Sequence, residues 1–348
     1  MTIKRYLLIG YLGANNLGDE CMLRQFLSLF DEFPNVSFII DSHGIDYTSD
    51  RIITHFIPSD TNTRRLEYGK IIGEVDGIIW VGGNCFTDYD GAGAVRLAMK
   101  AKTMGKRFYY VSVGTDRLTL FKRKWRAFLS LHLADSIIFR DKFSLNHAKS
   151  CFVNSKKLAL APDLGELYLR HNAGNYSVET YEIVVSWREL KKNISNQDEL
   201  LENLSMFLVN LSALYNRRLI IFNTDEYSDK QVHASLIDLL IKHGFSNFTY
   251  VEDTTLEEKL TIISRACCVI TARLHTAVAA DVFDKPIVVY NYSQKISEFA
   301  FGKENVKVIS GNLAELTADD IDLKEKTSKE AIAIDEKVYK NFAVQCKE

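Results

Sequence analysis

The chain contains few of the residues that interrupt or cross-link a fold. Its 348 residues include only four prolines, which leaves little room for disordered linkers. It has six cysteines, and none of them forms a C-x-x-C pair or another spacing typical of metal ligands. We therefore expect reduced, buried cysteines in a cytoplasmic protein, and neither a metal nor a cofactor is predicted.

Long apolar runs and an excess of charge of one sign are also absent. The apolar run at residues 6–10 soon meets Asn15, Asn16, Asp19 and Glu20, so neither a signal peptide nor a membrane span is expected. The formal net charge of −2 provides no basic field, which argues against a nucleic-acid partner. The 47% of hydrophobic and 25% of charged residues are typical of a soluble globular protein.

Short apolar strands alternate with helical stretches along the whole chain. In the first half, strands are predicted at residues 6–10, 36–41, 77–81, 107–113 and 136–140, and helices at 19–33, 95–104 and 119–134. In the second half, strands are predicted at residues 182–186, 218–222, 247–250, 267–270 and 286–290, and helices at 198–215, 230–243 and 256–265. This alternation predicts an α/β fold with two doubly wound, Rossmann-like domains facing a cleft.

A polar, turn-forming run separates the two halves. It is His171-Asn172-Ala173-Gly174-Asn175, within an interruption expected between about residues 169 and 181. The N-terminal domain is therefore predicted at residues 1–172 and the C-terminal domain at 173–312. The charge-rich remainder, 313–348, is expected to be a helical tail that packs back on the body, with its helix at 328–344.

The segment Thr271-Ala272-Arg273-Leu274-His275-Thr276 joins an apolar strand to a helix. Unpaired backbone N–H groups and the helix dipole favour an anion at such a junction. Arg273 and His275 add a guanidinium and an imidazole, which predicts a phosphate or carboxylate site with a titratable group beside it. The alternative is a surface salt bridge for Arg273 and a helix cap for His275.

Two further cations follow strands of the second half. Arg188 comes after the strand at 182–186, and Lys295 comes after the strand at 286–290. Ligands bind at the carboxyl ends of strands in open α/β sheets. Arg188, Arg273 and Lys295 are therefore expected to converge on one small, highly anionic ligand.

Glycine-rich turns follow the strands of the first half. The turn after residues 6–10 matches neither G-x-G-x-x-G nor the Walker spacing, so neither a dinucleotide nor a nucleoside triphosphate is predicted. Asp19 is expected to cap the following helix. Asp88, after Gly82-Gly83-Asn84, has two interpretations: it orients or deprotonates an acceptor hydroxyl, or it caps a helix. For Arg140-Asp141 a structural ion pair is expected.

The stretch Phe121-Lys122-Arg123-Lys124-Trp125-Arg126-Ala127-Phe128 is both cationic and aromatic. One interpretation is contact with a membrane surface or a lipid pyrophosphate, which would suit a lipid-linked sugar acceptor. The other, which we favour from the sequence, is an ordinary amphipathic helix with Phe121, Trp125 and Phe128 packed inward.

Taken together, these motifs resemble those of the polysaccharide pyruvyl transferase family. In chain order they are Asn16-Leu17-Gly18-Asp19-Glu20, Gly82-Gly83, Phe139-Arg140-Asp141 with Ser144-Leu145, Ala161-Pro162-Asp163, Val185-Ser186-x-Arg188, Arg273-Leu274-His275 and Tyr292-Ser293-x-Lys295. Each is short, but seven in the right order are specific, and the resemblance runs from about residue 6 to residue 300. The chain departs from the family at Asn84, which shortens the glycine run, and at Ser112-Val113-Gly114-Thr115, which is an unusual version of a glycine-containing turn. Both departures lie in the half of the chain that is expected to hold the acceptor, so the identity of the acceptor stays open.

The resemblance implies a GT-B-like fold and a reaction. A pyruvyl group would pass from phosphoenolpyruvate to hydroxyls of a sugar in a bacterial-type surface or capsular polysaccharide pathway, forming a ketal and releasing phosphate. By hypothesis, His275, Asp88 and Arg273 are catalytic. The predicted donor-binding residues are Arg188, Arg273, Leu274, His275 and Lys295. The predicted acceptor-binding residues are Asn16, Gly18, Asp19, Gly83, Asn84 and Asp88.

Two other functions stay open. A GT-B glycosyltransferase that uses a nucleotide sugar would have the same architecture. Against it, no Asp or Glu at a strand end of the second half is clearly placed to bind a ribose, since Asp281 and Glu298 lie in predicted helices. A non-catalytic paralogue that binds an anionic glycan would keep the anion site without turnover. The expected location is the cytoplasm, with peripheral membrane contact if the acceptor is lipid-linked.

Overall fold

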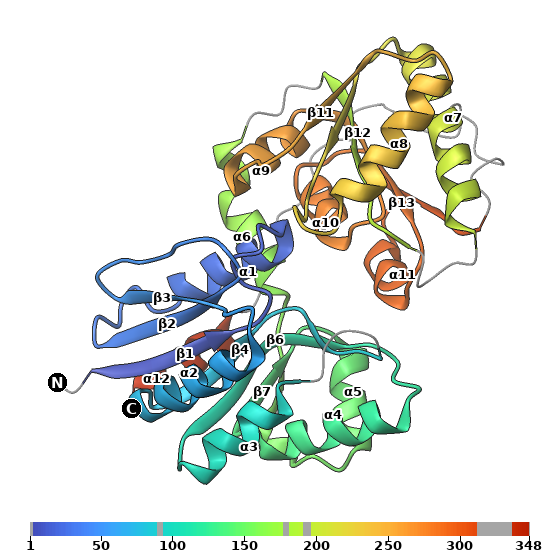
Figure 1. Ribbon diagram of the computed structural model, residues 1–348. Helices are drawn as coiled ribbons and strands as arrows, with labels where there is room; N and C mark the ends of the chain where they lie inside the picture. Colours follow the sequence, from blue (N-terminus) through green and yellow to red (C-terminus); the bar gives the residue numbers. More distant parts are fainter. Residues whose placement is uncertain (1–2, 89–92, 177–180, 191–195, 312–335, 348) are drawn as a thin grey trace. The chain divides into compact units, whose positions relative to one another are not determined.

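The chain forms two α/β units, each a parallel sheet with helices on both faces (Figure 1). The computed structural model describes residues 3–88, 93–176, 181–190, 196–311 and 336–347. Unit 1 comprises Met1–Tyr168 and Ile332–Glu348, and unit 2 comprises Leu169–Ala331. The division thus follows residue 168, where the sequence pattern had placed it after residue 172.

The sheet of unit 1 has the strand order of a doubly wound fold. Its strands, from edge to edge, are β3 (Ile52–Phe56), β2 (Val36–Ser42), β1 (Lys4–Ile9), β4 (Gly77–Val81), β6 (Arg107–Thr115), β7 (Ser136–Phe139) and β8 (Leu158–Leu160), with β5 (Asn84–Phe86) paired to β6. All these pairings are parallel. The strand order reverses between β1 and β4, which is where a ligand crevice opens in such sheets.

Alternating side chains of the strands serve two cores in unit 1. Tyr6 and Leu8 of β1 belong to the core that α1 (Leu17–Ser28), α6 (Leu164–Asn172) and α12 (Lys337–Lys347) cover. Leu7 and Ile9 belong to the core on the opposite face. The helices on that second face are α2 (Thr61–Glu74), α3 (Val95–Thr103), α4 (Phe121–Leu133) and α5 (Lys142–Ser150).

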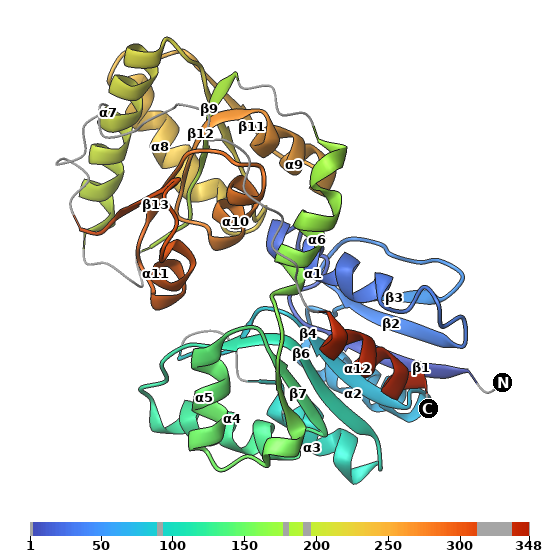
Figure 2. The ribbon, with the colours of Figure 1, turned by 180° about the vertical axis from the view of Figure 1, so that it is seen from behind.

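Helix α12 is the last described element and belongs to unit 1 (Figure 2). Phe342 packs edge-on against Tyr109 with ring centroids 5.3 Å apart, and the Tyr6 hydroxyl donates to the carbonyl of Cys346 at 2.8 Å. Of the helix expected at 328–344, residues 328–335 lie outside the described residues, as does most of the tail expected at 313–348. The described part continues three residues further, to residue 347.

Unit 2 has the Rossmann strand order. Its strands, from edge to edge, are β11 (Phe248–Val251), β10 (Leu219–Phe222), β9 (Glu182–Ser186), β12 (Ala266–Thr271), β13 (Ile287–Tyr290) and β14 (Val306–Ile309), all paired in parallel. The order reverses between β9 and β12. The helices are α7 (Gln197–Tyr215), α8 (Lys230–Lys242), α9 (Leu256–Ser264), α10 (Leu274–Val282) and α11 (Gln294–Ala300).

Some local predictions were wrong. Helix α1 begins at Leu17, and its cap is Asn16, whose side chain accepts from the N–H groups of Gly18 and Asp19; Asp19 itself lies inside the first turn. Helix α6 continues through His171 and Asn172, where a turn was expected, and a 3₁₀ turn follows at Ala173–Asn175. The apolar residues Leu164 and Leu167 anchor this helix in the core of unit 1.

Candidate active site

The predicted anion site is the junction of β12 and α10, at the reversal point of the sheet in unit 2. The backbone N–H of Arg273 donates to Thr271 Oγ1 at 2.9 Å, which fixes the turn. Arg273 is the N-cap residue of α10, but its side chain makes no capping hydrogen bond. The N–H groups of the first turn, which include those of Leu274 and His275, therefore have no side-chain acceptor from the cap and face the end of the strand.

Three predicted cations gather around Tyr292. Arg188 Nη1 donates to the Tyr292 hydroxyl at 2.9 Å, and its guanidinium carbon lies 5.0 Å from the ring centroid. Lys295 Nζ lies 6.0 Å from the same centroid. Burial would raise the pKa of Tyr292, but the charges of Lys295, Arg188 and Arg273 outweigh it and lower the pKa. The carboxyl ends of β9, β12 and β13 thus bring their cations to one place.

Arg273 also forms a buried ion pair. Its Nη2 donates to Asp229 and to Ser228 Oγ, and it lies 3.5 Å from Asp225 Oδ2. Burial would lower the pKa of Arg273, yet the Asp229 and Asp225 carboxylates raise it. The two interpretations of Arg273 therefore coexist: it stands at a helix N-terminus, and it is salt-bridged. The salt bridge is buried and not at the surface, because the Arg273 side chain is only 12% exposed.

Several buried polar atoms at the same strand ends have no hydrogen-bond partner among the described residues. They are Arg188 Nε, Arg273 Nε, Thr276 Oγ1 and Ser293 Oγ. A buried polar group without a partner is unfavourable by about 1–3 kcal/mol. A phosphate or carboxylate would satisfy both guanidinium N–H groups through charge-assisted hydrogen bonds.

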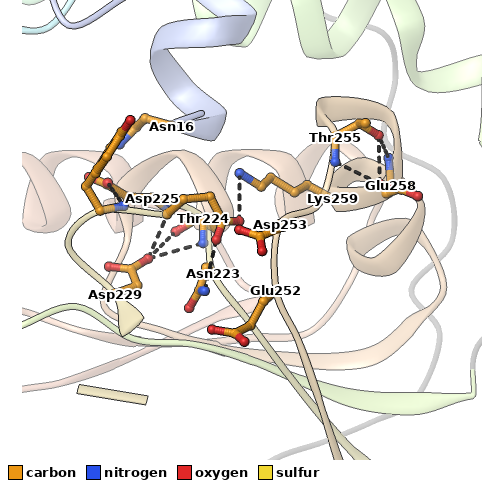
Figure 3. A network of polar contacts seen from close by, with 12 residues as sticks. Asn16, Asn223, Thr224, Asp225, Asp229, Glu252, Asp253, Thr255, Glu258 and Lys259 are labelled. Carbon is orange, nitrogen blue, oxygen red and sulfur yellow. Dashed lines mark hydrogen bonds and ion pairs between the residues drawn. The ribbon is translucent and has the colours of Figure 1, made fainter. Parts of the chain in front are cut away.

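The turn between β10 and α8 holds Arg273 in place, and sequence reasoning missed it. Figure 3 shows Asn223, Thr224, Asp225 and Asp229 of this turn. The Asp229 carboxylate accepts from the N–H of Thr224 at 3.1 Å, the N–H of Asp225 at 3.0 Å and Thr224 Oγ1 at 3.1 Å. The expectation that no carboxylate at a strand end of the second half is placed to bind a ribose stays untested, but it overlooked Asp225 and Glu226, which follow β10 after Asn223 and Thr224. The available signal was the polar run Asn223-Thr224-Asp225-Glu226 after an apolar strand.

The same turn also supports Arg188. The backbone N–H of Trp187 donates to His233 Nε2 at 2.9 Å, and His233 Nδ1 lies 2.8 Å from Asn223 Oδ1. Burial lowers the pKa of His233 to about 4, so the ring is neutral and carries its proton on Nδ1. This imidazole fixes the backbone immediately before Arg188.

A buried ion pair ties the turn to α9. Lys259 Nζ lies 3.6 Å from Glu226 Oε1, and the Lys259 side chain is fully buried. Burial lowers the pKa of Lys259, and the Glu226 carboxylate partly opposes this. The turn after β10 is thus held from both sides.

In unit 1, two of the predicted acceptor loops meet. Gly83 has a φ of +70°, and a Cβ built there would lie 3.6 Å from Asp19 Oδ1. Asn84 Nδ2 donates to Asp116 Oδ1 at 2.5 Å, and Asn84 Oδ1 accepts from Arg140 Nη2 at 2.8 Å. Asp19, Gly83 and Asn84 are therefore joined around the carboxyl ends of β4 and β6.

The ion pair of Arg140 differs from the expected one. Arg140 Nη1 binds Asp163 Oδ2 at 2.8 Å, and the Arg140 side chain is 8% exposed. Asp141 instead caps α5 by accepting from the N–H and hydroxyl of Ser144. The strand ends of β7 and β8 lie side by side in the sheet, so the carboxylate that reaches Arg140 comes from the neighbouring strand.

Asp88 contacts the segment just before α4. Its carboxylate accepts from the N–H and hydroxyl of Thr119 at 2.7 and 2.6 Å, and from the N–H of Leu120 at 3.2 Å. The hydrogen bond from the Thr119 hydroxyl contributes most to a lowered pKa of Asp88. Asp88 thus holds the segment before α4 and, among the described residues, accepts from none of the N–H groups of the helix itself, and both its capping role and its role as a base stay predictions.

Two classes of feature are absent from the described parts of both units. No group of three or more His, Cys, Asp or Glu side chains is placed there to hold a metal ion. Within the same residues, no helix has the length and apolar character needed to cross a membrane. All six cysteines are free, and all except the half-buried Cys151 are buried.

Two parallel, doubly wound sheets with flanking helices define an α/β protein of the GT-B class. A family model described as polysaccharide pyruvyl transferase matches residues 16–294. The chain belongs to the polysaccharide pyruvyl transferase family, as its motifs predicted. Membership makes it a transferase that acts on a polysaccharide. No curated protein sequence matches the chain.

Solved structures of the GT-B fold resemble the chain closely in architecture. UDP-GlcNAc 2-epimerase from Methanocaldococcus jannaschii is 12% identical, with 99% of each chain covered and a TM-score of 0.67. The enzyme of the same name from Rickettsia bellii is 14% identical, with 100% of this chain and 94% of that chain covered and a TM-score of 0.66. E. coli heptosyltransferase WaaC with ADP is 14% identical, with 91% and 97% covered and a TM-score of 0.50. These similarities confirm the predicted fold class and, at such identity, carry no further conclusion.

Proposed function

We propose that the chain transfers a pyruvyl group from phosphoenolpyruvate to two hydroxyls of a sugar, forming a ketal and releasing phosphate, in a bacterial-type surface or capsular polysaccharide pathway. One observation carries the choice of donor: the buried Nε atoms of Arg188 and Arg273 lack partners among the described residues, beside the uncapped start of α10. Phosphoenolpyruvate carries a phosphate and a carboxylate on one carbon atom, and planar guanidinium groups suit both.

Each donor residue has a distinct role in this proposal. Arg188 and Arg273 bind the two anionic groups, and the N–H groups of Leu274 and His275 bind the phosphate at the start of α10. Lys295 adds positive charge that stabilises the phosphate as it leaves. The His275 imidazole transfers the proton that the reaction requires.

The chemistry then proceeds in two bond-forming steps. A proton from His275 adds to the methylene carbon of the enol, and the neighbouring carbon becomes cation-like. A sugar hydroxyl attacks that carbon and gives up its proton, which replaces the proton that His275 donated. A second hydroxyl attacks the same carbon and displaces phosphate, which departs with one proton, so that the products are a cyclic ketal with a free carboxylate and inorganic phosphate.

The acceptor belongs to unit 1 in this proposal. Asn16 and Gly18 shape the turn at the start of α1, and Asp19, Gly83 and Asn84 present polar groups to the sugar. Asp88 holds the chain ahead of α4 through Thr119 and Leu120. The acceptor is a lipid-linked oligosaccharide, and the protein works in the cytoplasm at the inner face of the membrane.

Binding and turnover with defined compounds test the donor assignment. We expect calorimetric titration to show binding of phosphoenolpyruvate, and we expect that binding to weaken strongly in Arg188→Ala and Arg273→Ala. Arg218→Ala is the matched control, because Arg218 is exposed and precedes β10 at the opposite end of the sheet. Phosphate release with extracted glycolipid acceptors should fall about 10²–10⁴-fold in His275→Ala.

The same titration separates the rival functions. Several structural neighbours have names that include UDP, and two are complexes that contain UDP. Binding of UDP-GlcNAc with no response to phosphoenolpyruvate would replace the proposal by a nucleotide-sugar enzyme. Binding of phosphoenolpyruvate or an anionic glycan without any product of increased mass would favour a non-catalytic paralogue. Near-normal activity of both Arg273→Ala and His275→Ala would refute the site assignment.

A further inference from the structure

Helix α4 exposes large aromatic side chains that neither the fold nor the proposed chemistry uses. Phe121 is 83% exposed, Trp125 is 53% exposed, and Leu120, just before the helix, is 52% exposed. The expectation that Phe121 and Trp125 pack inward is therefore wrong. An exposed apolar group of this kind on a protein surface marks an interaction site more often than an isolated residue does.

Small residues explain why the aromatic side chains remain outside. The buried residues of α4 include Ala127, Ser130 and Leu131, and two of these join Ala98 and Ala101 of α3 in one core. A helix that packs through alanine and serine approaches its neighbour closely. Bulky rings cannot enter such a contact, so they remain on the far side of the helix.

Helical geometry places the aromatic residues on one stripe. At about 100° per residue, Phe121, Trp125, Phe128 and His132 fall within about 60° of one another, and the buried face is centred about 140° away. The rings of Trp125 and Phe128 stack with centroids 5.5 Å apart and an interplanar angle of 10°. The stripe is thus an ordered aromatic surface on the solvent side of α4.

Cations flank the aromatic stripe. Lys122 and Lys124 lie on either side of it, Arg126 and Arg123 lie farther round the helix and away from it, and the helix contains no acidic residue. The acidic groups on adjoining segments are Asp88, whose carboxylate binds Thr119 and Leu120, and the exposed Asp116, which accepts from Asn84. The surface is therefore apolar at its centre and positive at its sides.

Only one common surface complements both properties. A bilayer with anionic lipids offers negative headgroups to Lys and Arg, and it offers an apolar layer a few ångströms deeper to exposed rings. Tryptophan in particular prefers the boundary between headgroups and acyl chains. A folded acidic protein would match Lys122 and Lys124 but would leave Phe121 facing polar groups.

We propose that α4 is the site at which the protein docks on an anionic lipid bilayer, with Leu120, Phe121 and Trp125 entering the interface and Lys122 and Lys124 facing the headgroups. The inference rests on the proposed function and deepens it, because a lipid-linked acceptor lies at such a surface. Asp88, in the predicted acceptor loop, binds the two residues that directly precede α4. Docking through α4 therefore brings the acceptor loop to the membrane.

Vesicle binding of the full chain tests the proposal. We expect co-sedimentation with phosphatidylcholine vesicles that contain a quarter phosphatidylglycerol, and little with pure phosphatidylcholine. Phe121→Ser/Trp125→Ser should weaken binding at least about tenfold. Lys122→Glu/Lys124→Glu should weaken it at least about 30-fold, since each cation near the surface contributes a factor of about five. Of the three tryptophans, Trp125 is the one more than half exposed, so bromolipids should quench wild-type emission and leave Trp125→Phe almost unaffected.

Matched controls alter equally exposed residues elsewhere. Phe152→Ser removes a ring that is 90% exposed, and Lys70→Glu/Lys340→Glu reverses two exposed charges outside α4. Both should bind as the wild type does. Absence of vesicle binding, binding that ignores charge reversal in α4, or dimerisation through Phe121 without vesicle binding would overturn the inference. Failure to transfer pyruvate despite vesicle binding would instead refute the proposed function alone, because docking requires no turnover.

Discussion

Arg188→Ala provides a direct test of whether Arg188 serves the ligand or the fold. A structural arginine stabilises its protein, and its loss is destabilising. A ligand-binding arginine at this site stands among like charges with an unpaired Nε, so its loss should affect binding far more than stability. The two roles therefore predict opposite outcomes for the same variant.

The structure supplies the magnitudes. Removing Arg188 loses its hydrogen bond to the Tyr292 hydroxyl, about 1 kcal/mol, and its contact with the Tyr292 ring, about another 1 kcal/mol. It also removes a buried unpaired N–H, which is unfavourable by about 1–3 kcal/mol, and relieves repulsion from Arg273 and Lys295. The free energy of unfolding should therefore change by no more than about 1 kcal/mol.

Binding should change much more. A hydrogen bond to a charged group contributes about 1.5–3 kcal/mol, so the Kd for phosphoenolpyruvate should rise about 12- to 140-fold. Calorimetric titration measures the Kd, and urea denaturation measures stability. Lys259→Met is the control for stability in the same unit, because it leaves the buried Glu226 carboxylate without its cation and should lose about 3–5 kcal/mol. A loss of more than about 3 kcal/mol in Arg188→Ala with unchanged binding would show that Arg188 is structural.

Three further variants test the surroundings. Asp229→Asn keeps an acceptor for the turn but removes the negative charge that pairs with Arg273. Urea denaturation should show a free energy of unfolding about 1–3 kcal/mol lower, and titration should show phosphoenolpyruvate binding about tenfold weaker. Unchanged binding would argue against a role of Asp229 in positioning Arg273. His233 has a pKa of about 4 in the fold and 6.5 ordinarily, so the stability it contributes is complete above pH 6.5 and falls by about 3 kcal/mol as the pH is lowered to 4. In urea denaturation at a series of pH values, His233→Gln should lack this pH dependence of the free energy of unfolding. The same dependence in His233→Gln would contradict a neutral, buried His233. Asp88→Asn should lower kcat less than about tenfold, because the amide oxygen still accepts from Thr119. A fall of about 10²-fold or more in the rate of phosphate release would instead support Asp88 as the catalytic base.

The central strands could be read directly from the sequence. The predicted strands at 77–81 and 182–186 have the same bounds as β4 and β9, because each is a continuous apolar run buried on both faces of a parallel sheet. The partly exposed edge strands β3 and β14 were missed, whereas the edge strand β11, which is also only partly buried, was predicted at 247–250. Burial on both faces therefore gives the clearest signal in the sequence, but it does not by itself decide which strands are found.

The cations of the candidate site were predictable for a related reason. Parallel strands bring their carboxyl ends to one edge of the sheet, so Arg188, Arg273 and Lys295 had to end near one another once the strands were known. Their partners were not predictable in this way. Asp229 reaches Arg273, and His233 reaches the N–H of Trp187, from a turn and a helix that only the strand order places beside β9.

The sequence by itself determined the α/β class, the central strands, the family and the residues at the strand ends, because these depend on local patterns and on chain order. Only the tertiary structure decided which groups those residues contact. Arg140 pairs with Asp163 from the loop after the neighbouring strand, and Arg273 pairs with Asp229 from the loop after β10, two strands away across β9. The tertiary structure also decided that α4 packs through Ala127 and Ser130 and leaves Phe121 and Trp125 exposed. The sequence could not show this, because helical periodicity alone does not say which face of a helix meets the core.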